Sequence, residues 1–209
     1  MSEVSTKEKE LDIEQPLHFD SEEAFEAWCD EDIRAEYLNG EVIIHSPADT
    51  VHENSIHWLG ALLQFFIDRE GLGELFGSNT QIRLFTGKRR LADMAFVAKA
   101  RLEIVHPTYI DGAPDLVVEF VSEESTVRDW REKYWEYEAA AVKEYWVIDQ
   151  RLKRMDLYIL GEDQKYFVAQ EQDGKLFSNV LPGFWLKPEW LWQQPLPSAY
   201  VIAHEIGIF

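Results

Sequence analysis

The chain has 209 residues, of which 46% are hydrophobic and 13% aromatic, enough to bury the core of one domain. Its formal net charge of -19 argues against sequence-blind binding to a phosphate backbone, because a polyanion would be repelled at long range. The single cysteine, Cys29, excludes an internal disulfide and a thiolate zinc cluster. No uncharged apolar stretch reaches the about 18 residues of a membrane helix, so we expect a soluble, cytoplasmic protein without a membrane span.

Charge and turn signals divide the chain into three parts. The first 36 residues hold 13 acidic and 3 basic residues, about half of the acidic excess. We expect a flexible acidic lead-in at residues 1–19, a single domain at 20–193 and a C-terminal extension at 194–209. The basic run Lys88-Arg89-Arg90 is interpreted as a solvated turn rather than a phosphate contact.

Capping and turn residues predict the first elements in chain order. Ser21 precedes an acidic turn, which is typical of the start of a capped helix. Asn39-Gly40 lies between two strand-like runs within residues 34–45 and predicts a β-hairpin with a type I′ turn. Apolar residues recur every three or four positions over 56–67, which predicts a long helix ending at Gly71.

The middle of the chain contains strand-like runs and a second helix. Residues 81–85 and 91–97 are interpreted as a second hairpin around the turn 86–90. The apolar run 115–121 predicts a central strand covered on both faces, and residues 127–142 predict a second long helix. Thr126 and Asp129 are spaced as in a capping box at the start of that helix.

The last part of the chain predicts further strands and an aromatic tail. Residues 144–149 form the next predicted strand, with short strands near 154–160, 165–171 and 175–177. The segment 185–197, rich in Trp and Pro, is interpreted as a peripheral extension packed by aromatic residues. The order helix, three strands, helix, strand predicts an α/β fold with a mixed α+β sheet and an αβββαβ core.

Two acidic residues stand within apolar strand-like runs. Asp93 lies in Leu91-Ala-Asp-Met-Ala-Phe-Val97 and Glu119 in Leu116-Val-Val-Glu-Phe-Val121. An ionised carboxylate is costly in such a setting unless it meets a cation or water. The pair is interpreted as two metal ligands sharing one cleft, or alternatively as buried ion pairs with nearby arginines.

A lysine on the second predicted helix completes a candidate centre. Asp129, Lys133 and Tyr137 are spaced four residues apart and therefore share one helix face. Metal-assisted phosphodiester cleavage needs oxygen ligands and a cation beside the reacting phosphate, which Lys133 could supply. Alternatively, Lys133 forms a surface pair with Asp129, and Tyr137 only packs in the core.

Several separated segments, in the right order, carry a family resemblance. They are Arg34-Ala-Glu-Tyr-Leu-Asn-Gly-Glu41, Ser46-Pro47 with His52-Glu53, Asp93-Met-Ala-Phe-Val97, 112–122, 128–134 and 144–149. Together they resemble the Uma-two family of "putative restriction endonucleases" in the PD-(D/E)XK nuclease superfamily, from residue 20 to residue 193. The resemblance implies a restriction-endonuclease-like fold and a divalent-metal-dependent endonuclease that hydrolyses DNA phosphodiester bonds.

The resemblance also implies roles for individual residues. Asp93 and Glu119 match the two acidic ligands of Mg²⁺ or Mn²⁺, and the backbone carbonyl of Phe120 would be a third ligand. The superfamily lysine normally stands two residues after the second acid, where this chain has Val121, and Lys133 takes its place in this branch. Ala92 replaces the expected proline, a departure that concerns backbone shape more than metal binding.

Glu36 and His52 match family positions as well. In a nuclease they would be an extra ligand near the first helix and a contact to a phosphate or base. Alternatively, Glu36 is a surface charge of the hairpin, and His52 is a polar residue near the start of a helix.

Two functions follow from these observations. The first is an endonuclease with DNA as its partner, which we expect to act as a homodimer. The second is a catalytically inactive nuclease-fold protein that serves as an oligomeric interaction module, anchored by Trp185, Trp190 and Trp192. Convergence of Asp93, Glu119 and Lys133 on one pocket would distinguish the first from the second.

Overall fold

The computed structural model describes residues 17–30, 33–46, 49–122 and 125–209, and most of the predicted lead-in lies outside these ranges. The larger of its sheets has six strands in the order β11-β10-β9-β8-β6-β3. Strands β8 and β9 run parallel, and the other neighbours run antiparallel. The strands are β3 (Gly73–Gly77), β6 (Met94–Ala98), β8 (Leu116–Phe120), β9 (Glu144–Asp149), β10 (Arg154–Leu160) and β11 (Tyr166–Val168).

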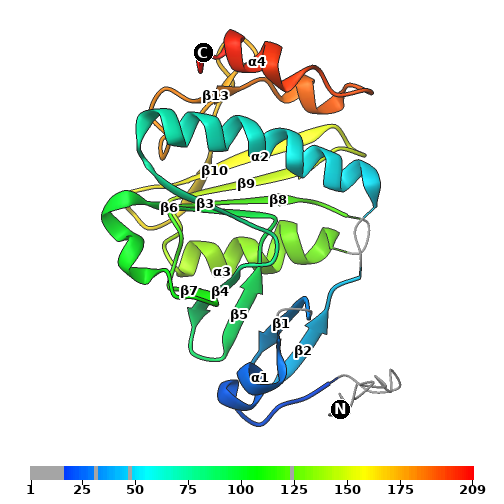
Figure 1. Cartoon of the computed structure of the whole chain (residues 1–209), viewed down its shortest axis with the longest axis vertical. Coiled ribbons are helices and arrows are strands. Elements are labelled where there is room, and N and C mark those ends of the chain that lie inside the picture. The colour runs from blue at the N-terminus through cyan, green and yellow to red at the C-terminus, as the bar shows by residue number, and fades with distance from the viewer. Residues whose placement is uncertain (1–16, 31–32, 47–48, 123–124) are drawn as a thin grey trace, which may run out of the picture.

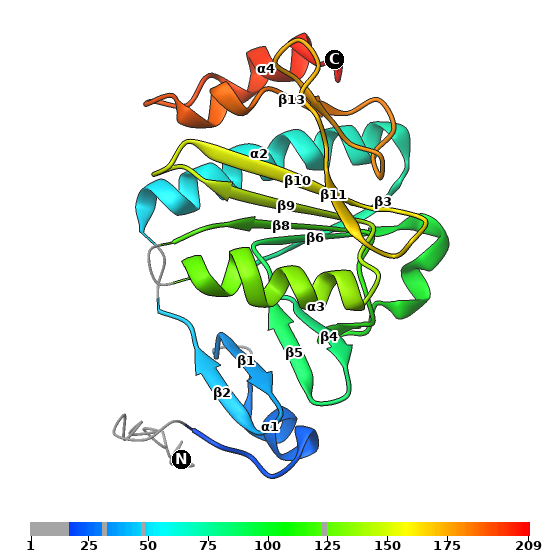
Figure 2. The same cartoon turned by 180° about the vertical axis from the view of Figure 1, so that it is seen from behind.

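Helices cover both faces of this sheet (Figures 1 and 2). Helix α2 (Thr50–Glu70) buries the predicted apolar stripe and ends at Gly71, whose φ of 62° provides the left-handed cap. Helix α3 (Lys133–Ala139) lies on the opposite face and connects the parallel strands β8 and β9. The order α2, β3, β6, β8, α3, β9 confirms the predicted αβββαβ core.

The N-terminal elements form as the turn and cap signals predict. Helix α1 (Glu22–Trp28) begins after Ser21, whose hydroxyl accepts a hydrogen bond from the amide of Ala24 at 3.2 Å. Strands β1 (Ala35–Leu38) and β2 (Glu41–Ile44) pair antiparallel around Asn39-Gly40. These two residues have φ of 52° and 105°, so the predicted hairpin is confirmed.

The predicted second hairpin is wrong in its partner strands. Strand β4 (Gln81–Phe85) pairs with β5 (Lys88–Leu91), which occupies most of the segment interpreted as a turn. Strand β5 ends before Ala92-Asp93. The chain then enters the six-stranded sheet as β6, which pairs with β3. The second sheet has the order β2-β1-β5-β4-β7, with β7 spanning Tyr109–Asp111. The β1–β2 hairpin of this sheet and helix α1 lie at the end of the molecule opposite α4 (Figure 1).

Two of the three residues of the basic run in β5 are buried, which corrects its interpretation as a solvated turn. Arg89 and Arg90 are only 3% and 1% exposed. Arg89 pairs with Glu22 of α1, and Arg90 pairs with Glu36 of β1 and Glu136 of α3. Ion pairs with acids distant in sequence therefore hold β5 between the hairpin and α3.

The C-terminal segment packs on the core through α2. Trp190 and Leu191 are buried there, and helix α4 (Ala199–Glu205) packs against α2. Trp185 and Trp192 pack partly buried against the same core. The remaining elements are η1 (Lys99–Ile104), β12 (Leu176–Phe177), β13 (Trp185–Leu186) and η3 (Pro188–Trp192).

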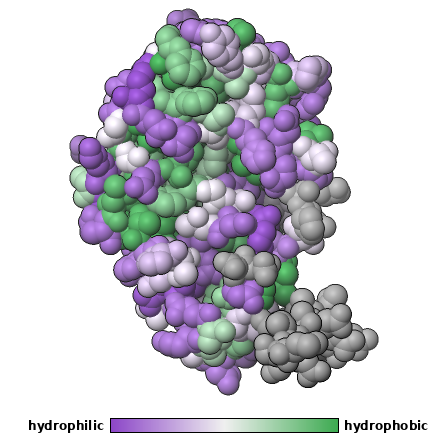
Figure 3. Space-filling view, viewed as in Figure 1, coloured by the Kyte–Doolittle hydropathy of each residue, from purple (hydrophilic) through white to green (hydrophobic). Residues whose placement is uncertain are grey.

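Part of the surface over α2 and α4 is apolar. The Phe209 ring contacts those of Phe65 and Tyr200 there, and Phe65, Tyr200 and Phe209 are 49%, 67% and 61% exposed. Figure 3 shows hydrophobic side chains interspersed with polar ones on this end of the molecule. Among the described residues, no helix combines the length and apolarity needed to cross a bilayer.

Candidate active site

Asp93 and Glu119 lie on neighbouring segments of the chain. Asp93 occupies the break between β5 and β6 rather than the interior of a strand, which corrects its predicted setting. Since Met94 pairs with Val118 in the antiparallel register, Asp93 is level with Glu119. The Asp93 carboxylate accepts a hydrogen bond from the Phe120 amide at 2.7 Å, which fixes the connection to β8.

Lys133, the first residue of α3, contacts Glu119 from the helix that packs on that face of the sheet. Its Nζ lies 2.7 Å from Glu119 Oε1 and donates to the Leu91 carbonyl at 2.9 Å. Lys133 is only 2% exposed, so the alternative of a surface pair is wrong. Tyr137 donates its hydroxyl to the same Glu119 oxygen at 3.0 Å and therefore does more than pack in the core.

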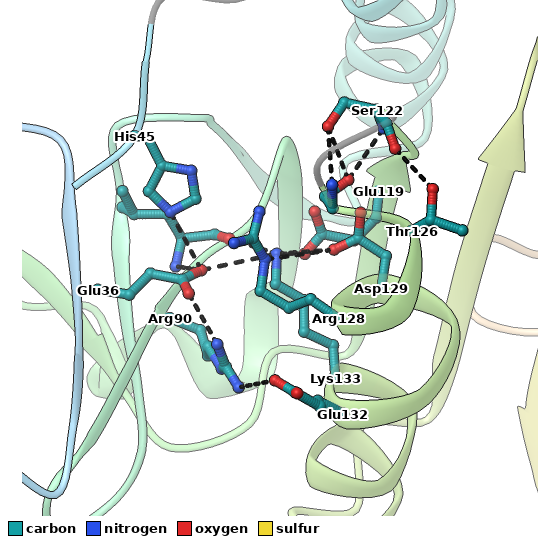
Figure 4. Close-up of polar contacts among 12 residues, drawn as sticks. Glu36, His45, Arg90, Glu119, Ser122, Thr126, Arg128, Asp129, Glu132 and Lys133 are labelled. Carbon is teal, nitrogen blue, oxygen red and sulfur yellow. Dashed lines mark hydrogen bonds and ion pairs between the residues drawn. The ribbon is translucent and has the colours of Figure 1, made fainter. Parts of the chain in front are cut away.

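A π-helical turn carries Asp129 and Lys133 into this cluster. The turn spans Arg128–Glu132, and the Lys133 amide donates to the Arg128 carbonyl five residues earlier. Asp129 Oδ1 lies 3.5 Å from Lys133 Nζ, so its side chain faces the lysine. The Thr126 hydroxyl donates to the Ser122 carbonyl, and the predicted capping box is not formed at this helix start. In Figure 4, Asp129 and Lys133 extend from the helix toward Glu119.

Burial and mutual contacts set the charges in the cluster. Burial raises the pKa of Glu119 to about 8; Lys133 opposes this change, whereas Asp129 and Asp93 add to it. Burial lowers the pKa of Lys133, but the surrounding carboxylates of Glu119, Asp129 and Glu36 raise it by more, so it stays above its usual value. Lys133 is therefore a fixed cation at neutral pH.

The predicted supporting residues Glu36 and His52 lie on different sides of the centre. Glu36 is completely buried and accepts from Arg90 and from the Leu91 amide, so the alternative of a hairpin surface charge is wrong. Its Oε1 lies 3.6 Å from Lys133 Nζ, so Glu36 lies beside the lysine. His52 Nε2 lies 3.6 Å from Asp93 Oδ1. Burial lowers the pKa of His52, but the hydrogen bond and charge of Asp93 raise it above its usual value.

A pocket of about 360 Å³ opens onto the cluster. Its walls come from the β1–β2 hairpin, the start of α2, the β5–β6 break and the π turn. The polar residues of its lining are Arg34, His45, Ser46, Asp49, His52, Ser78, Asp93, Glu119, Ser122, Ser125, Arg128, Asp129 and Lys133. Asp93, Glu119 and Lys133 thus converge on one pocket, as the endonuclease hypothesis predicts. No arginine pairs with either acid in the described ranges, which removes the alternative of buried arginine pairs.

The donor set suits a hard divalent cation. In the parts of the chain that the structure describes, no three His, Cys, Asp or Glu side chains form a metal cage. Mg²⁺, however, is commonly bound through one or two carboxylates and keeps several waters. A dication beside Glu119 would also offset the burial and the like charges that raise its pKa. Asp93 and Glu119 therefore fit such an ion.

Two arginines of the lining were missed as site residues by sequence reasoning. Arg34 precedes β1, and its carbonyl accepts from the His45 amide at 2.9 Å, opposite the end of β2. Arg128 begins the π turn. Both stand within segments that carry the family resemblance, but no motif or spacing marks an isolated arginine as part of a pocket.

Comparisons with known proteins agree with this architecture. The sequence model of the Uma2 family, described as "Putative restriction endonuclease", matches residues 22–189. The crystal structure of a "putative nuclease belonging to DUF820" from Anabaena variabilis ATCC 29413 has a TM-score of 0.62 at 15% identity. This match covers 76% of this chain and 89% of the other, so the two share a fold. No curated protein matches the sequence. Because the family match spans most of the chain, this protein belongs to the Uma2 family, as its separated segments predict.

Proposed function

We propose that this chain is a divalent-metal-dependent endonuclease of the PD-(D/E)XK superfamily that hydrolyses phosphodiester bonds in DNA. The observation that carries the proposal is the convergence of Asp93, Glu119 and Lys133 on one pocket. Membership in the Uma2 family supports it. An acidic pair beside a fixed cation is the set of groups that metal-assisted phosphodiester cleavage requires.

Asp93 and Glu119 would hold the cation, with the backbone carbonyl of Phe120 as a further oxygen ligand. When bound, Mg²⁺ or Mn²⁺ would lower the pKa of a coordinated water and polarise the phosphate. The Phe120 amide already holds one Asp93 oxygen at 2.7 Å, which orients that carboxylate before any ligand arrives. His52, at 3.6 Å from the other oxygen, is placed to contact the same carboxylate or an incoming phosphate.

Lys133 would offset the negative charge that develops on the reacting phosphate. Glu119 and the Leu91 carbonyl accept from its ammonium, and Asp129 at 3.5 Å restrains it from a third side. Tyr137 holds Glu119 rather than the lysine, so its proposed role is to orient the acid. Two such sites related by a two-fold axis would match the two strands of a duplex, and we therefore propose that the protein acts as a homodimer.

A metal-dependent cleavage assay tests the proposal directly. The purified chain is incubated with supercoiled, linear and branched DNA in Mg²⁺, in Mn²⁺ and in EDTA. We expect cleavage only with the metals, and a loss of about 100-fold or more in Asp93→Asn, which keeps the side-chain shape but removes a charged oxygen ligand. Asp68→Asn is the matched control, because Asp68 is an exposed residue of α2 that contacts Gln64.

Calorimetric titration with Mn²⁺ supplies a readout that does not depend on turnover. Wild type and Asp68→Asn are expected to bind the ion, whereas Asp93→Asn and Glu119→Gln bind it at least about tenfold more weakly, as expected for a lost ligand. Equal cleavage by Asp93→Asn and Asp68→Asn would refute the mechanism. Absence of metal binding and of cleavage in the wild type would favour the inactive interaction module.

A further inference from the structure

Most of the arginines in the described ranges pair with acids, as expected when 39 acidic residues face 20 basic ones. Seven of them have a carboxylate oxygen within 3.4 Å: Arg69, Arg83, Arg89, Arg90, Arg101, Arg151 and Arg154. In the described part of the chain, the arginines without such a partner are Arg34, Arg128 and the exposed Arg131. Two of these three line the pocket.

Both pocket arginines carry buried polar atoms without a hydrogen-bond partner. The Nε atoms of Arg34 and Arg128 are each inaccessible to solvent and make no hydrogen bond among the described residues. The nearest carboxylate oxygen to Arg128 is Asp129 Oδ1, at 3.9 Å. No close carboxylate of the described residues therefore neutralises either guanidinium group, so each can pair with an anionic ligand that offers several acceptor oxygens.

The π turn explains how Arg128 reaches the pocket. In a regular α-helix residues four apart align, and Arg128 would turn away from the face shared by Asp129 and Lys133. Here the amide of Lys133 bonds to the carbonyl of Arg128 five residues back, which brings these two residues toward one face. Figure 4 shows the Arg128 side chain beside Lys133 and Asp129. The wider turn therefore adds a second cation to the wall that carries Lys133.

Arg34 reaches the pocket from the β1–β2 hairpin, whereas Arg128 reaches it from the π turn before α3. It stands at the open end of the β1–β2 hairpin, tied to His45 through its carbonyl. Asp93 lies between β5 and β6, and Glu119 lies in β8. The two acids therefore come from other elements than the two arginines. The candidate metal ligands and two uncommitted guanidinium groups therefore line the same pocket from different elements.

We propose that Arg34 and Arg128 bind backbone phosphates next to the scissile phosphate and so hold the nucleic-acid strand across the acidic pair. This inference rests on the proposed nuclease function and assigns its strand-binding residues. Guanidinium groups suit the task because they pair with phosphate oxygens through two parallel hydrogen bonds. In a chain with a net charge of -19, such local cations supply the attraction that the whole molecule lacks.

The test measures binding separately from cleavage. Fluorescence anisotropy with a labelled oligonucleotide, single-stranded and duplex, is recorded in EDTA over a series of KCl concentrations. Arg34→Gln and Arg128→Gln should each weaken binding about tenfold, as for loss of a charged hydrogen bond, and reduce the slope of log K against log salt by about 0.7–0.9. Arg131→Gln is the matched control, since this exposed arginine lies outside the pocket and should leave the slope unchanged.

Conservative variants and thermal melts separate binding from folding. Arg34→Lys and Arg128→Lys keep the charge, so we expect them to retain the wild-type salt slope while losing part of the affinity. Wild-type binding to neither oligonucleotide, or Gln variants that melt like wild type and keep its affinity and salt slope, would overturn the inference. Arginine-dependent binding without any metal-dependent cleavage would uphold the role of the two arginines in binding the strand and would refute the proposed nuclease function.

Discussion

Arg90 is the residue whose structural role departs most from its appearance in the sequence. It stands in a run of three basic residues, yet it is 1% exposed and bridges Glu36 of β1 to Glu136 of α3, at 2.7 Å to each. Replacement by Met fills similar space but leaves both carboxylates without this partner. Breaking a buried ion pair from one side costs about 3–5 kcal/mol. For a protein of this size that corresponds to a fall in melting temperature of about 6–20 °C.

Urea denaturation followed by tryptophan fluorescence measures this loss. Lys165→Met is the control, because Lys165 pairs with Glu138 at 2.8 Å while its side chain is 65% exposed, and such pairs contribute about 0–1 kcal/mol. The deficit of Arg90→Met should also depend on pH. Burial raises the pKa of Glu136, but Arg90 and Lys88 lower it below its usual value, so the pair stabilises the fold at neutral pH and less as pH falls below about 4.5.

A result near that of the control would refute the argument. If Arg90→Met lost less than about 1 kcal/mol at neutral pH, the buried pairs would not hold β5 in place. The double variant Arg90→Met, Glu136→Gln supplies a second check. It should recover part of the loss, because a neutral amide at Glu136 removes one of the uncompensated charges.

Three further predictions concern stability, each measured by chemical denaturation. Gly73→Ala should lose about 1–3 kcal/mol, because its Cβ would lie 2.1 Å from the Val97 carbonyl oxygen, whereas Gly77→Ala, with open space around it, should be nearly neutral. Asp115→Asn should lose about 1.5–3 kcal/mol at neutral pH. Burial raises the pKa of Asp115, but its basic partners and an amide lower it below its usual value, so its difference from wild type should vanish in acid. Leu62→Ala, at a completely buried position of α2, should lose about 2–5 kcal/mol.

The elements that could be predicted are those whose signals are local. Asn39-Gly40 requires positive φ at two successive residues, and the apolar spacing of α2 requires one buried face, so both formed as expected. Asp93 is a polar anomaly in the run 91–97, but nothing local shows that two strands of different sheets meet there, because apolar residues continue on both sides. Strand β3 was missed because it begins and ends with glycine, which weakens the strand signal.

Buried charge is the part of the fold that the sequence conceals. Arg89 and Glu36 each resemble solvated residues, and the acids or bases that neutralise them are about 50 or more residues away. The acids of the site were recognised because each interrupts an apolar run, which is a local anomaly. Arg34 and Arg128 interrupt no such pattern, and the lack of a carboxylate partner is visible only after every ion pair is in place.

The position of the lysine follows from which face of β8 carries the acid. Val117 and Val121 share an apolar cluster with Tyr137 of α3, whereas Val118 and Phe120 pack with residues of α2. Glu119 alternates with the second pair and so faces α3, the same side as position 121. Val121 is buried in that cluster. Lys133, at the start of α3, donates a hydrogen bond from its ammonium to Glu119 on the same face of the sheet. The helix therefore places an ammonium group on the same face as position 121, the position where the superfamily that the sequence resembles carries its lysine.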